Sequence, residues 1–131
     1  MRKKVINPVE VETLHLPGRD LSWIVTPELT GIEKLSIAIM NCPPRSVVRP
    51  LHSHKDTEEV ILILQGQGKA WIDGEIVPFQ KGDAVIFHSN SKHQVMNTGG
   101  ETLITASIFS PPTNPDSYVI YPDDMFLELY E

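Results

Sequence analysis

Residues 52–66 contain side chains that could bind a metal ion at the entrance to an apolar run. The segment, HSHKDTEEVILILQG, places His52 and His54 one residue apart and adds two adjacent carboxylates, Glu58 and Glu59. In an extended segment, residues i and i+2 point to the same face, roughly 6.6 Å apart along the chain, so the two imidazoles project together. Two such rings can bind one divalent ion through nitrogens about 2.1 Å from it. The pair therefore indicates a metal site, although a His-x-His pair alone is also common by chance.

A third imidazole must come from another part of the chain. The candidates are His15, His88 and His93. His93 lies just past an apolar stretch in KGDAVIFHSNSKHQVMN, residues 81–97. A barrel or sandwich can bring such a strand beside the first one.

The elements that must position these side chains read as short strands separated by turns. Runs rich in Ile, Val and Leu cover residues 22–26, 35–42, 60–64, 69–72, 84–87, 94–97 and 103–109. Asp73-Gly74, flanked by AWI and EIV, predicts a hairpin, because a type I′ turn requires positive φ at both central residues. Many short strands with close turns predict an all-β, antiparallel sandwich or barrel. The best helix candidate, residues 123–130, is too short to form a stable helix by itself.

Composition and charge narrow the class of protein. The 131 residues suit a single domain spanning 1–131, and the formal charge of −6 argues against a nucleic-acid partner. Cys42 is the only cysteine, which excludes an internal disulfide and a cysteine-based zinc site. The longest apolar run, residues 60–64, is far too short to cross a bilayer, and no apolar segment of a signal peptide follows the basic residues near the N-terminus. We therefore expect a cytoplasmic protein with no membrane partner.

The spacing of residues across 52–97 resembles the two sequence motifs of the cupin superfamily. The first motif runs His-x-His, three or four residues, Glu, six residues, Gly. The second runs Gly, five residues, Pro-x-Gly, two residues, His, three residues, Asn. In this sequence the matching positions are His52, His54, Glu59, Gly66, Gly82, His93 and Asn97. The resemblance implies a jelly-roll barrel, the double-stranded β-helix of cupins.

Two positions depart from the second motif. Asn90 stands where the motif has Gly, and since Asn tolerates the left-handed conformation, we expect the turn to be kept. His88 stands where the motif has Pro, and we expect a loop residue near the barrel mouth rather than a catalytic group.

Either Glu58 or Glu59 could be the metal ligand, depending on which of them lies on the inward face of the strand. Strict alternation from His52 favours Glu58, but the polar, turn-like residues 55–57 can reset the face. The motif spacing selects Glu59. Ile61 and Ile63 should then share its inward face.

The resemblance implies one bound divalent transition metal, and the ligand types suit Fe, Mn, Zn, Ni and Cu about equally. The implied ligands are His52, His54, Glu59 and His93. In a six-coordinate ion they leave two positions open for a small molecule. Asn97 either holds one of these ligands in place or is a turn residue before Gly99.

A divalent ion with one carboxylate leaves a net positive charge in an apolar barrel, so we expect an anionic or chelating small molecule to bind there. Cupins include dioxygenases, decarboxylases, isomerases, lyases and metal-free binders. The complete ligand set favours a metal-dependent oxygenase, isomerase or lyase, whereas the missing acid–base signature favours the alternative, a non-catalytic binding or sensing module. Acid–base candidates by residue type alone are Glu58, His88, Tyr118 and Tyr121. Because cupins commonly dimerise, we also expect a homodimer, with residues 5–16 as a candidate exchanged edge strand.

Overall fold

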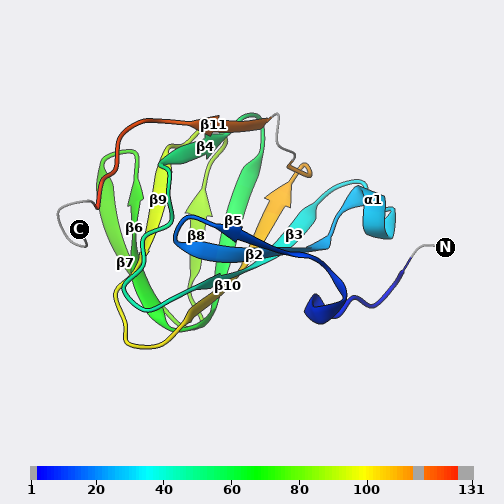
Figure 1. Ribbon diagram of the computed structural model, residues 1–131. Helices are drawn as coiled ribbons and strands as arrows, with labels where there is room; N and C mark the ends of the chain where they lie inside the picture. The colour runs from blue at the N-terminus through cyan, green and yellow to red at the C-terminus, as the bar shows by residue number, and fades with distance from the viewer. Residues whose placement is uncertain (1–2, 114–116, 127–131) are drawn as a thin grey trace.

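The computed structural model of the protein describes residues 3–113 and 117–126 and contains two antiparallel β-sheets around one interior (Figure 1). The larger sheet has the strand order β1-β2-β3-β10-β5-β8, and the smaller sheet has the order β11-β4-β9-β6-β7. Strands far apart in the sequence therefore pair, as β3 does with β10 and β4 with β9. This arrangement confirms the expected antiparallel jelly-roll barrel.

The larger sheet consists of β1 Thr13–Leu16, β2 Arg19–Val25, β3 Ser36–Cys42, β10 Leu103–Ser110, β5 Glu58–Gln65 and β8 Ala84–Phe87. The smaller sheet consists of β11 Tyr118–Ile120, β4 His52–His54, β9 His93–Asn97, β6 Gln67–Ile72 and β7 Glu75–Gln80. Two short helices, η1 Pro8–Glu10 and α1 Pro27–Thr30, precede and follow the first hairpin. Among the described residues, no helix is long and apolar enough to cross a membrane.

Alternation along the strands decides which side chains enter the interior. Every second residue of β3 is buried, and β10 repeats the pattern, as the two-residue period of a strand requires. The core combines Met40 and Ile61 of the larger sheet with Ala70, Phe79 and Val95 of the smaller one. Burial of a large apolar side chain stabilises the fold by about 1.5–3 kcal/mol. The core therefore holds the two sheets together and fixes the inward set of each strand.

Each of the seven strand ranges expected from the sequence overlaps an observed strand. The largest displacement is in β2, which begins at Arg19 rather than at residue 22. The hairpin prediction is also confirmed, because Asp73 and Gly74 have φ of 46° and 99° and join β6 to β7. Asn90 keeps the left-handed turn, with φ of 67°.

The two expectations for the ends of the chain have different outcomes. Residues 13–16, within the candidate exchanged strand, form β1 and pair with β2 of the same chain, and exchange between two copies stays a prediction. Residues 123–126 of the tail helix candidate are not helical, and residues 127–130 lie outside the described part of the chain.

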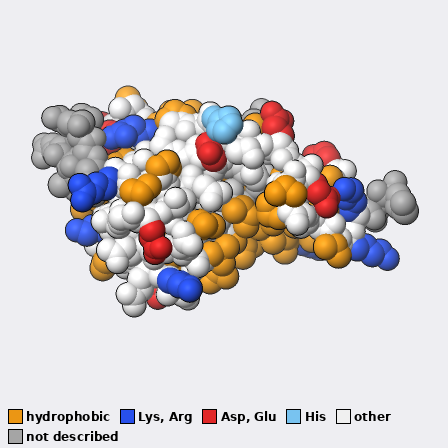
Figure 2. Space-filling model, turned by 60° about the horizontal axis from the view of Figure 1, so that its bottom comes forward, with side chains coloured by type: hydrophobic (Ala, Val, Ile, Leu, Met, Phe, Trp, Pro, Cys, Tyr) orange, Lys and Arg blue, Asp and Glu red, His pale blue; other side chains and the backbone are white. Residues whose placement is uncertain are grey.

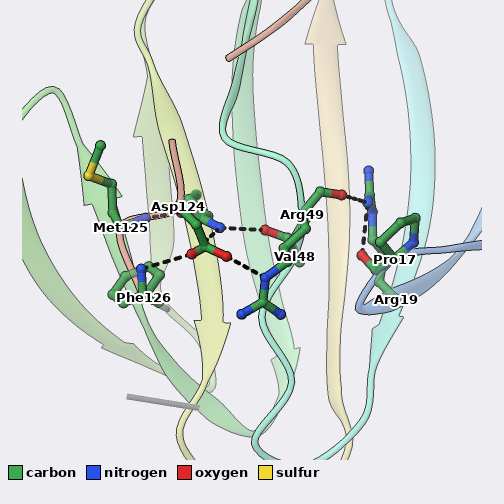
Figure 3. Close-up of polar contacts among 8 residues, drawn as sticks. Pro17, Arg19, Val48, Arg49, Asp124, Met125 and Phe126 are labelled. Atoms are coloured by element: carbon green, nitrogen blue, oxygen red, sulfur yellow. Dashed lines mark hydrogen bonds and ion pairs between the residues drawn. The ribbon is translucent and has the colours of Figure 1, made fainter. Parts of the chain in front are cut away.

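Residues 124–126 are held against the smaller sheet by a partly buried polar network around Asp124 (Figure 3). One carboxylate oxygen accepts from Arg49 Nε, and the other accepts from Gln94 Nε2 at 3.1 Å and from the Phe126 backbone N–H at 3.0 Å. Gln94 in turn accepts from the Met125 backbone N–H at 2.9 Å. Phe126 itself is buried, so polar and apolar contacts together hold this segment in place.

Asp124→Asn is expected to lower the free energy of unfolding by about 1–3 kcal/mol, because a charge-assisted hydrogen bond to Arg49 is lost. Burial raises the pKa of Asp124, but the hydrogen bonds from Arg49, Phe126 and Gln94 outweigh it and hold the pKa below its ordinary value. The stabilisation is therefore present above the pKa of an unfolded aspartate, about 3.9, and is lost as the pH falls below it. Urea unfolding at pH 7 and pH 3 measures both effects.

The neighbouring Asp123→Asn is the matched control, because Asp123 is exposed. Equal unfolding free energies for the two variants at pH 7 would contradict the role given to Asp124.

Candidate metal centre

β4 and β9 bring three histidines together on the inner face of the smaller sheet. All three residues of β4 are buried, including His52 and His54, and His93 stands at the start of β9 directly opposite His52. One nitrogen from each ring lies within 4.8 Å of the corresponding atoms of the other two. Because each metal–nitrogen distance is about 2.1 Å, nitrogens at this separation can share one ion. The three buried histidines could therefore hold a metal.

The turn between β4 and β5 decides which glutamate faces these rings. It includes Asp56, whose φ of 56° breaks the alternation that begins in β4. As a result Glu59 is buried together with Ile61 and Ile63, whereas Glu58 is exposed. The shared inward face of these three residues was expected and is confirmed.

The carboxylate of Glu59 joins the histidine group. Its Oε1 atom lies 3.4 Å from Nε2 of His54 and 3.2 Å from Nε2 of His93. The structure thus gathers all four side chains that the motif spacing selects, from three different strands.

Backbone contacts turn two of the rings so that Nε2 faces the group. Nδ1 of His52 lies 2.8 Å from the Pro50 carbonyl oxygen, and Nδ1 of His93 lies 3.0 Å from the Ser91 carbonyl oxygen. A carbonyl can only accept, so each Nδ1 carries a proton and each neutral ring presents an Nε2 lone pair. Contacts of this kind are the usual way in which a protein orients a metal-binding histidine.

Several buried polar atoms at this point have no hydrogen-bond partner among the described residues. They include Glu59 Oε1 and His93 Nε2, although the two atoms face each other. A lone pair facing a carboxylate oxygen is repulsive, and a buried polar atom without a partner costs about 1–3 kcal/mol. A cation between the atoms would remove the repulsion, so the residues present fit a bound metal.

The electrostatic surroundings favour the same donor set. Burial, helped by the nearby His93 ring, lowers the pKa of His52 to about 3, so this ring is neutral at neutral pH. Burial raises the pKa of Glu59, whereas hydrogen bonds from His54 and His93 and a positive charge on these rings outweigh it and lower the pKa. When the rings are neutral and Nε2 carries no proton, a cation bound between the same atoms would supply that charge. Imidazole nitrogens beside a carboxylate are a donor set that suits a divalent transition metal.

Aromatic side chains support the histidine rings and enclose them. Phe87 stacks on His93 with ring centroids 3.9 Å apart, and Tyr118 stacks on His52 at 4.6 Å. The histidines lie in the wall of a cavity of roughly 800 Å³ that is mostly apolar. The packing limits rotation of the rings, and the cavity leaves room beside them for a small molecule.

Arg19 and Tyr118 are polar members of the cavity wall, and the sequence pointed to only the second of them. Nη2 of Arg19 donates to the Tyr118 hydroxyl oxygen at 3.2 Å. Burial raises the pKa of Tyr118 to about 12, against the smaller opposing effect of Arg19. In the sequence, only the spacing of Arg19 could have indicated its position. Residues two apart in a strand share a face, and Arg19 shares a face of β2 with Leu21 and Trp23, which also line the cavity.

The other acid–base candidates lie away from the cavity wall. His88 and Glu58 have side chains that are 82% and 69% exposed, with 3.9 Å between Nδ1 and Oε2. This placement agrees with the expected loop position of His88. The Tyr121 hydroxyl lies 2.9 Å from Ser53 Oγ. His15, which was a candidate for the third imidazole, lies on the exposed first hairpin, with its Nδ1 atom 2.7 Å from Asp20 Oδ1.

Asn97 is buried at the end of β9, and its contacts are those of a turn residue. Its side chain bonds to the backbone of Cys42, Pro43, Gly99 and Glu101. None of these partners is a site histidine. The Asn97 side chain therefore links the backbone after β3 to the turn that follows β9.

The fold and the site together define the class of protein: a small jelly-roll barrel with three histidines and a glutamate on its inner wall as a candidate metal centre. The chain belongs to the cupin family, because the sequence model of the cupin domain matches residues 38–109, more than half of its length. Both the fold and the family that the two motifs implied are thereby confirmed.

Known proteins that are similar in sequence include the following two. One is the polyketide synthase CurC of Streptomyces cyaneus, 27% identical over 85% of this chain and 71% of that protein. The other is the auxin-binding protein ABP19a of Prunus persica, 28% identical over 85% of this chain but only 59% of that protein. Among solved structures, a predicted oxalate decarboxylase of Thermotoga maritima has 24% identity and a TM-score of 0.73 over 82% of this chain and 99% of that chain. At this identity the structural likeness shows the shared fold alone.

Proposed function

We propose that this protein is a metal-dependent enzyme that acts on a small anionic or chelating metabolite, by oxygenase, isomerase or lyase chemistry. The observation that carries the proposal is the convergence of three buried histidines and Glu59 in a cavity wall, where Glu59 Oε1 and His93 Nε2 have no hydrogen-bond partner among the described residues. A closed structural site would have its donors covered by protein, whereas these donors border open space.

In this proposal His52, His54, His93 and Glu59 hold one divalent ion, which would supply Lewis-acid chemistry or activation of a bound oxygen ligand. Phe87 and Tyr118 keep the rings in place. Because the Tyr118 oxygen accepts from Arg19, its own proton remains available for donation into the cavity. Tyr118 is thus the acid–base candidate best placed to stabilise negative charge on a bound substrate.

The size and the lining of the cavity favour a small metabolite as its ligand. Its wall is mostly apolar, and a volume of roughly 800 Å³ accommodates a ligand well beyond the size of a single carboxylate.

The alternative function is binding or sensing without turnover. Its support is the exposure of Glu58 and His88, which leaves few titratable groups beside the candidate metal. The similarity to an auxin-binding protein points in the same direction.

One experiment separates the two functions. The protein is purified without an affinity tag, loaded anaerobically with Fe(II), Mn(II) or Zn(II), and given a panel of keto acids, hydroxy acids and catechols. Oxygen uptake or product formation that depends on the metal supports the enzyme. Saturable binding of the same compounds with no turnover under any metal supports the binding module and contradicts the enzyme.

We further propose a homodimer formed through the outer face of the larger sheet. Hydrophobic side chains gather in a band on the surface seen in Figure 2. The strand register sets outward residues of four strands in two uncharged rows: Ile37, Ile108, Val60 and Ile86, then Ile39, Ala106, Leu62 and Ala84. An uncharged sheet face can pack on its own copy, with a stable interface burying roughly 800 Å² per partner.

Ile86→Lys is expected to convert the dimer to a monomer, because two copies of the new charge would be buried in the interface. Ile76→Lys is a matched control, since Ile76 is 50% exposed and Ile86 is 49% exposed, but Ile76 lies on β7 in the other sheet. Sedimentation velocity measures the mass of each variant. A monomeric wild-type protein, or equal dissociation of both variants, would contradict this interface.

A further inference from the structure

Arg19 is a buried cation in the wall of the cavity that holds the histidine group. It is 8% exposed and lies on the inward face of β2, close to the loop before β4. Its Nη1 atom donates to the carbonyl oxygens of Pro17 at 3.1 Å and Arg49 at 2.6 Å (Figure 3), and its Nη2 atom donates to Tyr118. These contacts fix the direction of the guanidinium.

No carboxylate of the described residues, 3–113 and 117–126, forms an ion pair with Arg19. Arg49, the other arginine of the cavity wall, is paired with Asp124. Burying a cation without an anion is costly, so an anion bound beside Arg19 would stabilise this arrangement.

The hydrogen-bond donors of Arg19 are only partly used. A guanidinium carries five N–H groups, and the contacts to described residues use both protons of Nη1 and one of Nη2. The Nε proton and one Nη2 proton are left. Nε and Nη2 lie along one edge of the guanidinium, where they can hold the two oxygens of a carboxylate.

Tyr118 connects Arg19 to the candidate metal centre. The tyrosine hydroxyl accepts from Arg19, and the tyrosine ring stacks on His52 and meets His54 edge-on. The two positive groups of the cavity are therefore separated by about one aromatic ring. Apolar side chains such as Trp23 and Phe109 form the wall around them.

We propose that Arg19 is a substrate-binding residue that holds the distal carboxylate of a two-headed organic acid. The other end of the same ligand, a chelating hydroxy or keto acid group, reaches the metal held by the histidines. This inference rests on the proposed metal-dependent function and narrows its substrate class to dicarboxylic hydroxy or keto acids. Apolar carbon between the two ends fits the apolar wall.

Isothermal titration of the Zn(II)-loaded full chain with paired 2-hydroxy acids tests the assignment. Malate, 2-hydroxyglutarate and 2-hydroxyadipate carry the distal carboxylate, and lactate, 2-hydroxybutyrate and 2-hydroxyvalerate carry the same chelating group without it. At least one diacid should bind wild-type protein about tenfold or more tightly than its monoacid partner, as a charge-assisted bidentate contact predicts. In Arg19→Gln this ratio should fall to about one, and Arg19→Lys should retain part of it.

Arg49→Gln is the matched control, because it removes a second guanidinium of the cavity wall whose charge Asp124 already balances. It should keep the advantage of the diacid. An equal loss in both variants would show that total charge, not Arg19, is responsible, and would overturn the assignment. So would a wild-type protein without preference for any diacid, or a preference that persists in Arg19→Gln. Circular dichroism confirms that the compared variants are folded.

A second titration, without metal, distinguishes failure of the proposed metal function from failure of the proposed carboxylate site. Titration of the metal-free protein with glutarate measures the contribution of Arg19 alone. Wild-type protein should bind glutarate about threefold or more tightly than Arg19→Gln does. The effect is small because only one end of the ligand is held. If the chain takes up no metal but this difference is found, the metal function fails and the carboxylate site stands. If metal binds but neither titration depends on Arg19, the carboxylate site fails.

Discussion

Replacing His93 by glutamine is expected to lower the affinity for Zn(II) or Mn(II) about a hundredfold or more. The change removes a nitrogen donor that backbone contacts hold toward the other ligands, and disturbing even the partners of ligands costs 10–100-fold. Glutamine keeps much of the volume and can bond to the Ser91 carbonyl, so the fold should survive. Competition titration against a chromophoric chelator measures the affinity.

His88→Gln is the matched control for this substitution. It is the same chemical change in the same segment of chain, but the His88 side chain is 82% exposed and lies outside the cavity wall. Its metal affinity should equal that of the wild-type protein. Similar affinities for His93→Gln and His88→Gln would place the metal elsewhere.

Replacing Glu59 by glutamine is expected to act in opposite directions on metal affinity and on stability. Metal affinity should fall, because the only carboxylate among the four candidate ligands is lost. The metal-free protein should become more stable, because the new amide can donate to the His93 Nε2 lone pair where a buried carboxylate oxygen now faces it without a hydrogen bond. Relief of about 1–3 kcal/mol corresponds to a rise in Tm of several degrees.

Glu58→Gln separates this effect from simple removal of charge. Glu58 is the adjacent residue, with a side chain that is 69% exposed, so its neutralisation should leave both metal affinity and Tm nearly unchanged. Differential scanning calorimetry with and without Zn(II) gives both quantities. A metal-free Glu59→Gln protein that melts below the wild-type protein would show that the carboxylate stabilises the fold without a metal.

The strands and the ligand group could be predicted because they depend on local patterns. Apolar alternation located seven strands, and the turn chemistry of Asp73-Gly74 located the hairpin. His52 and His54 could be paired by parity within one strand. Glu59 was harder, because the positive φ at Asp56 breaks that parity, and only the motif spacing identified the buried glutamate.

The remaining features depend on tertiary contacts that local patterns do not encode. Arg19 precedes the first expected part of its strand and is buried only because β11 and the loop before β4 supply acceptors for its guanidinium. The partly buried Asp124 network was missed for the same reason, since its partners Arg49 and Gln94 lie 75 and 30 residues away in sequence. Asn97 has a motif position, yet its contacts bind loops together rather than a histidine.

X-ray absorption spectroscopy of the protein loaded with one equivalent of Zn(II) tests the metal centre most directly. The expected first coordination shell contains three imidazole nitrogens and carboxylate oxygen at about 2.0–2.2 Å, with the multiple-scattering signature of histidine reduced in His93→Gln. A shell made only of oxygen, or a histidine signature that is unchanged in His93→Gln, would contradict a metal site formed by His52, His54, Glu59 and His93.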